Sequence, residues 1–123
     1  MVKSPEQALG VVAMEIGTEK YGEVTVVRVS GSFAFGGDVQ LREKFAELLK
    51  NDVRTFVLDM SNVAFIDSIG LGETVACTKR IRERGGSITL VLAETGKTRE
   101  VFTITGVDRA FEVFTSAEAA LAD

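Results

Sequence analysis

Histidine is absent from this chain of 123 residues. Without it, neither a Ser-His-Asp triad nor a Cys-His pair can form, and the side chain best suited to proton transfer at neutral pH is missing. Histidine-ligated zinc is excluded for the same reason. The sequence therefore predicts a protein that is not an enzyme and that carries no catalytic residue, metal or cofactor.

Cysteine occurs only once, as Cys77, so no intramolecular disulfide can form and the count fits a reducing compartment. The chain shows no basic-then-apolar leader, and no apolar run approaches the roughly 20 residues that span a bilayer. We therefore expect a cytoplasmic protein without membrane insertion. Cys77 itself is expected to be a half-buried, inert thiol, because no histidine can activate it.

Positive charge is also in the minority, since 14 Lys and Arg face 18 Asp and Glu and give a net charge of −4. The main basic cluster, at 79–84, has Glu83 within it and Glu73 six residues before it. This composition argues against binding to a phosphate backbone, which usually needs a concentrated basic patch. A solvated helix face is the favoured interpretation, and no nucleic acid partner is expected.

Apolar periodicity divides the chain into alternating strands and helices. Strands are expected at 12–19, 23–30, 54–60, 87–93 and 112–114, and helices at 38–50, 68–84, 95–104 and 117–122. This order predicts one compact α/β domain over 13–123, with a largely parallel sheet whose first two strands form an antiparallel hairpin. The preceding segment, 1–12, is an N-terminal extension in which Pro5 favours a short helix.

Two glycine motifs and three aspartates suggest ligand sites only weakly. Gly70-Leu71-Gly72 lacks the third glycine of the dinucleotide fingerprint, and Gly96-Lys97-Thr98 lacks the upstream glycine of a P-loop. A small-nucleotide module therefore has little support. Asp38, Asp59 and Asp67 could bind magnesium if the fold brought them together, but nothing in the sequence fixes their distances, so no metal is expected.

Ser68 begins the second long helix and allows two interpretations. Asp67 or Ser68 can cap the helix by accepting a hydrogen bond from a first-turn amide. The same helix start would tolerate a phosphoryl group, because its unpaired amides and dipole favour negative charge. Gly70 and Gly72 would let another protein approach closely. On the residues alone, both roles stay open.

Phe33 and Phe35 lie in the segment 31–37, which is expected to be a loop. Their rings either pack into the core or offer a partner an exposed aromatic contact.

Three segments, at 56–72, 84–92 and 101–114, resemble the signature of STAS domains, the family of bacterial anti-sigma factor antagonists. The first contains D-S-I-G-L-G, and the likeness covers roughly Met14 to Leu121. It implies a small mixed sheet with helices packed on it and a role as a partner switch. The unphosphorylated form would bind an anti-sigma factor with a serine-kinase fold and so release the sigma factor. Phosphorylation of Ser68 would end that complex, and a metal-dependent serine phosphatase would restore it.

The expected partner-binding residues are Asp67, Ser68, Ile69, Gly70, Gly72, Glu73, Ala76, Phe33 and Phe35. The sequence departs from the family pattern at Ala34, where many members have the aspartate of G-E-L-D, and at Ile69, where many have Ser or Thr. These departures leave an alternative, in which the chain is a constitutive STAS accessory subunit of a transport complex and Ser68 is only a helix cap.

Overall fold

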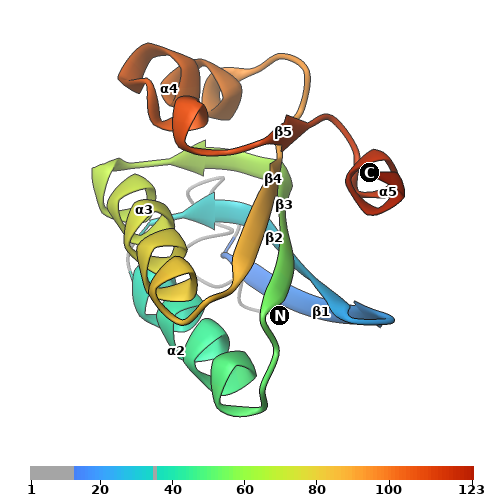
Figure 1. Ribbon diagram of the computed structural model, residues 1–123. Coiled ribbons are helices and arrows are strands. Elements are labelled where there is room, and N and C mark those ends of the chain that lie inside the picture. Colours follow the sequence, from blue (N-terminus) through green and yellow to red (C-terminus); the bar gives the residue numbers. More distant parts are fainter. Residues whose placement is uncertain (1–12, 35) are drawn as a thin grey trace, which may run out of the picture.

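The computed structural model describes residues 13–34 and 36–123, and its framework is a five-stranded sheet (Figure 1). The expected helix near Pro5 and the side chain of Phe35 lie outside the described residues. The strands follow one another in chain order across the sheet. They are β1 (Glu15–Tyr21), β2 (Val24–Phe33), β3 (Thr55–Ile66), β4 (Ser87–Val91) and β5 (Val113–Phe114).

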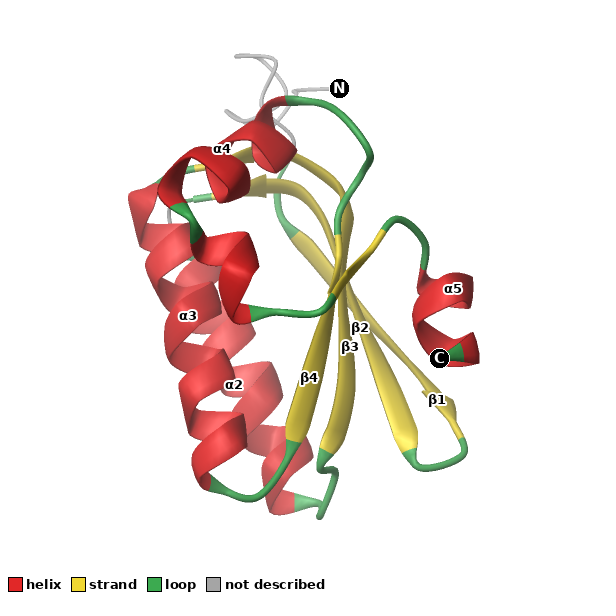
Figure 2. Cartoon of the chain, turned by 45° about the horizontal axis from the view of Figure 1, so that its top comes forward, coloured by secondary structure: helices red, strands yellow, loops and turns green. Residues whose placement is uncertain are grey.

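The helices lie on both faces of this sheet. They are α2 (Gly37–Lys50), α3 (Ser68–Glu83), α4 (Lys97–Thr105), the 3₁₀-helix η1 (Val107–Ala110) and α5 (Ala117–Ala122). Helices α2 and α3 run side by side on one face, and the short α5 lies on the other (Figure 2). The predicted α/β class and order of elements are therefore confirmed, and among the described residues, 13–34 and 36–123, η1 is the one element that the sequence did not indicate.

The pairing of the strands follows from their connections. β1 and β2 are joined by a tight turn and pair antiparallel, from Glu15 opposite Ser30 to Tyr21 opposite Val24. Every later pair of neighbours is parallel, as expected for strands that are separated by a crossover helix. The predicted hairpin and parallel sheet are both confirmed.

Two strands run further than the sequence predicts. β2 continues to Phe33 rather than ending at Ser30, and β3 continues to Ile66 rather than Met60. The pairing survives because the register shifts twice, between Arg28 and Ser30 and again after Gly31, which has a φ of +87°. Phe33 and Ile66 therefore end the two strands side by side, immediately before Asp67 and Ser68.

The main core lies between the sheet and the helices α2 and α3. Phe45 of α2 meets Phe56 of β3 edge to face, with ring centroids 5.2 Å apart. From the helical spacing of its side chains, the sequence predicts that Thr74, Val75 and Ile81 of α3 all face inward. Thr74 and Ile81 are buried, whereas Val75 is 44% exposed, so the prediction is wrong for Val75. The buried face of α3 is centred on the row 70–74–77–81, and Val75 lies outside that row.

Candidate functional site

Ser68 is the first residue of α3 and lies at the carboxyl end of β3. The helix cap is the preceding residue, because Asp67 Oδ1 accepts a hydrogen bond from the Gly70 amide at 2.9 Å. The Asp67 amide in turn donates to the carbonyl of Phe33, at 3.4 Å. Ser68 is exposed, and its hydroxyl makes no hydrogen bond to any described residue. The interpretation of Ser68 as the cap is therefore wrong.

Gly70 contributes to packing rather than to access. A Cβ built on it would lie 2.6 Å from the Phe33 carbonyl oxygen and 2.9 Å from Phe33 Cδ1. Gly37, in the first turn of α2, would place its Cβ 3.2 Å from the same ring atom. The first turns of both helices thus press on one phenylalanine. Phe33 is fully buried, so the prediction that it contacts a partner is wrong and its expected place in the core is confirmed.

The surface around Ser68 is smooth and partly apolar. Ile69 is 55% exposed, and Phe65, which sequence reasoning missed, is 50% exposed. Gly72 is exposed and would have no heavy atom within 4 Å of an added Cβ. We call Phe65, Asp67, Ser68, Ile69 and Gly72 the Ser68 surface. Phe65 could have been found from the sequence only by continuing the strand past Met60.

Two further apolar residues lie at the same end of the molecule as the Ser68 surface. Ala76, one turn beyond Gly72, is half-buried and remains at its edge. Val39, in the first turn of α2, is 43% exposed. Because β2 and β3 are parallel, α2 and α3 both begin at the carboxyl edge of the sheet, so these apolar side chains lie at the same end of the molecule.

Glu73, expected on the partner face, instead points into the molecule. Its carboxylate is 5% exposed and pairs with Arg42 of α2, at 2.9 Å, and with Arg80 of α3. The thiol of Cys77 donates a third hydrogen bond to it, at 2.9 Å. The prediction that Glu73 binds a partner is therefore wrong, because the residue joins α2 to α3.

This network also fixes two protonation states. Burial alone would raise the pKa of Glu73, but hydrogen bonds from Cys77, Arg42 and Arg80 outweigh it and hold the pKa below its ordinary value. Burial raises the pKa of the Cys77 thiol, and the hydrogen bond to Glu73 adds to that shift. Cys77 is fully rather than half buried, and its thiol remains protonated at neutral pH.

The three aspartates considered for magnesium have other partners. Asp38 pairs with Arg42 at 3.3 Å, Asp59 with Arg28 at 2.8 Å, and Asp67 caps α3. Among residues 13–34 and 36–123, no group of three His, Cys, Asp or Glu could hold a metal ion. The structure therefore does not bring these aspartates together as ligands.

The position of the missing family aspartate is now defined. Ala34 follows the end of β2 and is buried at 9% exposure, beside the buried Phe33. Its carbonyl accepts a hydrogen bond from Gly37, at the start of α2, at 3.1 Å. Asp38 is directed to Arg42, so it does not take the place of an acid at Ala34.

A model of the STAS domain family matches residues 15–120, and the chain belongs to that family. None of the helices described in the structure is long and apolar enough to cross a membrane.

The solved structures to which the chain is similar include anti-sigma factor antagonists and part of an anion transporter. The chain is similar to an anti-sigma factor antagonist from Mycobacterium paratuberculosis, with a TM-score of 0.80 and 22% identity over 98% of this chain and 97% of that one. It is similar to the anti-sigma factor antagonist SpoIIAA in its unphosphorylated form, with a TM-score of 0.71 and 21% identity over 86% of this chain and 93% of that one. It is also similar to part of the murine anion transporter Slc26a9, with a TM-score of 0.68 and 22% identity over 85% of this chain but 18% of the transporter. At these identities the likeness shows a shared fold.

Proposed function

We propose that this STAS protein is an anti-sigma factor antagonist that acts as a phosphorylation-controlled partner switch. In its unphosphorylated form it binds an anti-sigma factor with a serine-kinase fold, and the sigma factor is released. The kinase then transfers a phosphoryl group from ATP to Ser68, and the complex dissociates. A metal-dependent serine phosphatase reverses the modification. The protein itself performs no catalysis and works in the cytoplasm, where ATP and the sigma factor are available.

The observation that carries this proposal is the separation of roles between two adjacent residues. Asp67 caps α3, so the hydroxyl of Ser68 is exposed and free to react. A phosphoryl group there would sit at the amino end of a helix, where the dipole and the first-turn amides favour negative charge. The fold can therefore accept the modification without losing its own contacts.

The surroundings of Ser68 explain how the modification would release a partner. A phosphoryl group adds about 1.5–2 negative charges between Phe65 and Ile69, whose side chains are half exposed. A partner that packs on these apolar side chains would have to bury that charge, and Asp67 adds a like charge beside it. Desolvation of an unpaired charge costs several kcal/mol, so even about 3 kcal/mol would weaken binding more than a hundredfold.

The test uses ATP and the kinase-fold anti-sigma factor of the source cell, with intact mass as the readout. Wild type and Ser87→Ala, which removes another exposed serine, should each gain one phosphoryl group. Ser68→Ala should gain none. Ser68→Asp should bind the same partner at least about tenfold more weakly than wild type. Modification of Ser68→Ala, or unchanged binding by Ser68→Asp, would refute the switch.

A second function is favoured by Ala34 and by the likeness to part of an anion transporter. In this alternative the chain is a constitutive STAS subunit of a transport complex, and Ser68 is not modified. Purification of the tagged protein from its source cell discriminates the two. A kinase-fold protein that stays bound supports the switch, whereas a transporter subunit supports the alternative.

A further inference from the structure

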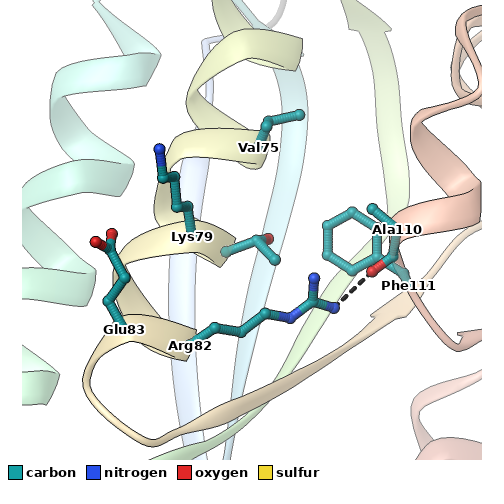
Figure 3. A pocket seen from close by; sticks show the side chains of 7 residues that line it. Val75, Lys79, Arg82, Glu83, Ala110 and Phe111 are labelled. Carbon is teal, nitrogen blue, oxygen red and sulfur yellow. Dashed lines mark hydrogen bonds between the residues drawn. The ribbon is translucent and has the colours of Figure 1, made fainter.

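A pocket of about 370 Å³ opens between the C-terminal half of α3 and η1, away from the Ser68 surface (Figure 3). It is lined by Val75, Thr78, Lys79, Arg82, Glu83, Ala110 and Phe111. Its volume lies in the range of small-molecule sites, roughly 300–1,000 Å³. None of these residues has a role in the partner switch.

The walls of the pocket are mainly apolar. Val75 is 44% exposed, on the side of α3 that faces away from the main core. It faces the ring of Phe111 and the methyl group of Ala110 across the pocket (Figure 3). An occupant with an apolar body would remove all three from water, which is favourable in proportion to the area covered.

A positive charge, the guanidinium of Arg82, lies beside the apolar walls of the pocket. Arg82 crosses toward η1, donates from Nη2 to the carbonyl of Ala110 at 2.5 Å, and lies 5.9 Å from the centroid of Phe111 (Figure 3). These contacts hold the guanidinium in place, and its remaining N–H groups have no hydrogen-bond partner among the described residues. The side chains of Lys79 and Glu83 both point away from Phe111, so Arg82 is the cation that faces the apolar walls (Figure 3).

The same geometry restricts the kind of ligand. The guanidinium of Arg82 disfavours a positively charged occupant, and a small inorganic anion would leave the apolar walls uncovered. The face of Phe111 is already approached by Arg82, so a nucleobase would have to displace that contact to stack on the ring. A carboxylate attached to a short apolar chain satisfies both the guanidinium and the walls.

We propose that the pocket between α3 and η1 binds small amphiphilic carboxylates, with the carboxylate on Arg82 and the apolar chain between Val75 and Phe111. This site is independent of phosphorylation at Ser68.

Titration of the ¹⁵N-labelled protein with octanoate, followed by amide chemical shifts, tests the proposal. Saturable shifts are expected at Val75, Arg82 and Phe111, with a Kd below about 10 mM. Acetate has the charge without the chain, and octylammonium has the chain with the opposite charge. Neither should produce these shifts at the same concentration.

Matched variants complete the test. Val75→Asp and Arg82→Gln should each raise the Kd for octanoate at least about tenfold, because they remove the apolar wall or the cation. Val39→Asp, at an equally exposed valine, and Arg84→Gln, at an exposed arginine outside the pocket, should bind as wild type does. Val75 is at the surface, so its variant stays informative if Arg82→Gln fails to fold. Absence of saturation, equal shifts with octylammonium, or unchanged binding by Val75→Asp would overturn the proposal.

Discussion

Replacing Gly70 with alanine adds a methyl group where the start of α3 has no room for one. The new Cβ would lie 2.6 Å from the Phe33 carbonyl oxygen, a backbone atom held by the end of β2, and 2.9 Å from the ring. Overpacking of this kind lowers the free energy of unfolding by about 1–3 kcal/mol. We expect a loss of about 3 kcal/mol for Gly70→Ala, because the atom that it meets belongs to the backbone and cannot easily move. Alanine recovers at most about 1 kcal/mol of helix propensity. The net expectation is a loss of about 2 kcal/mol, or a melting temperature lower by roughly 8 °C.

Gly72 provides the matched control for this prediction. It lies in the same turn of α3, but an added Cβ would meet nothing within 4 Å. Gly72→Ala should therefore stabilise the protein by about 0.5–1 kcal/mol through helix propensity alone. Urea unfolding followed by far-ultraviolet circular dichroism measures both variants. If Gly70→Ala is as stable as wild type, or if Gly72→Ala loses as much as Gly70→Ala, the packing argument is refuted.

Three other predictions concern α3. Asp67→Ala should lower the free energy of unfolding by about 1 kcal/mol, because Asp67 caps the helix. Ser68→Ala should change the free energy of unfolding by less than about 0.5 kcal/mol, because Ser68 does not cap it. Equal losses for the two variants in urea unfolding would contradict the assignment of Asp67 as the cap. Glu73→Gln should cost about 1–3 kcal/mol at neutral pH. Because the folded pKa of Glu73 lies below the ordinary value of 4.5, its contribution is present above that value and is lost as the pH falls through the folded pKa. The stability gap to Glu73→Gln should therefore narrow in acid, and a constant gap between pH 7 and pH 3 would show that the pKa is not lowered. Cys77 should react with a disulfide reagent on the order of 10²-fold more slowly in the native protein than in urea, since its thiol is buried and its pKa is raised; comparable rates would contradict its burial.

The sequence predicted the sheet and its helices well because the apolar runs are long and clearly bounded. The sequence did not predict the ends of β2 and β3, because these depend on how the two strands pair with each other. Gly31 and Ser32 read as a loop, yet β2 passes through them because β3 lies alongside and the register shifts absorb the irregularity. No local pattern shows that two parallel strands will continue together to Phe33 and Ile66.

The residues of the candidate site also differ in whether local sequence or a distant partner determines their position. The position of Ser68 at the start of a helix can be predicted from local sequence. The sequence leaves both Asp67 and Ser68 as possible caps, and the hydrogen bond from the Gly70 amide to Asp67 identifies Asp67 as the cap. Glu73 could not be placed in this way. A glutamate on a helix normally faces water, and its burial depends on Arg42, which lies 31 residues earlier in the chain and on another helix.

The helix α5 has a consequence for how the molecule moves. It contains six residues and covers Val26, Val57 and Val91 with the small side chains of Ala117 and Ala120 and the partly buried Leu121. A helix this short has little stability of its own, so it should detach at a lower free energy than the sheet beneath it. Its amide protons would then exchange with solvent well before those of β2 and β3. Because α5 lies on the opposite face from α3 (Figure 2), each such opening leaves the Ser68 surface in place.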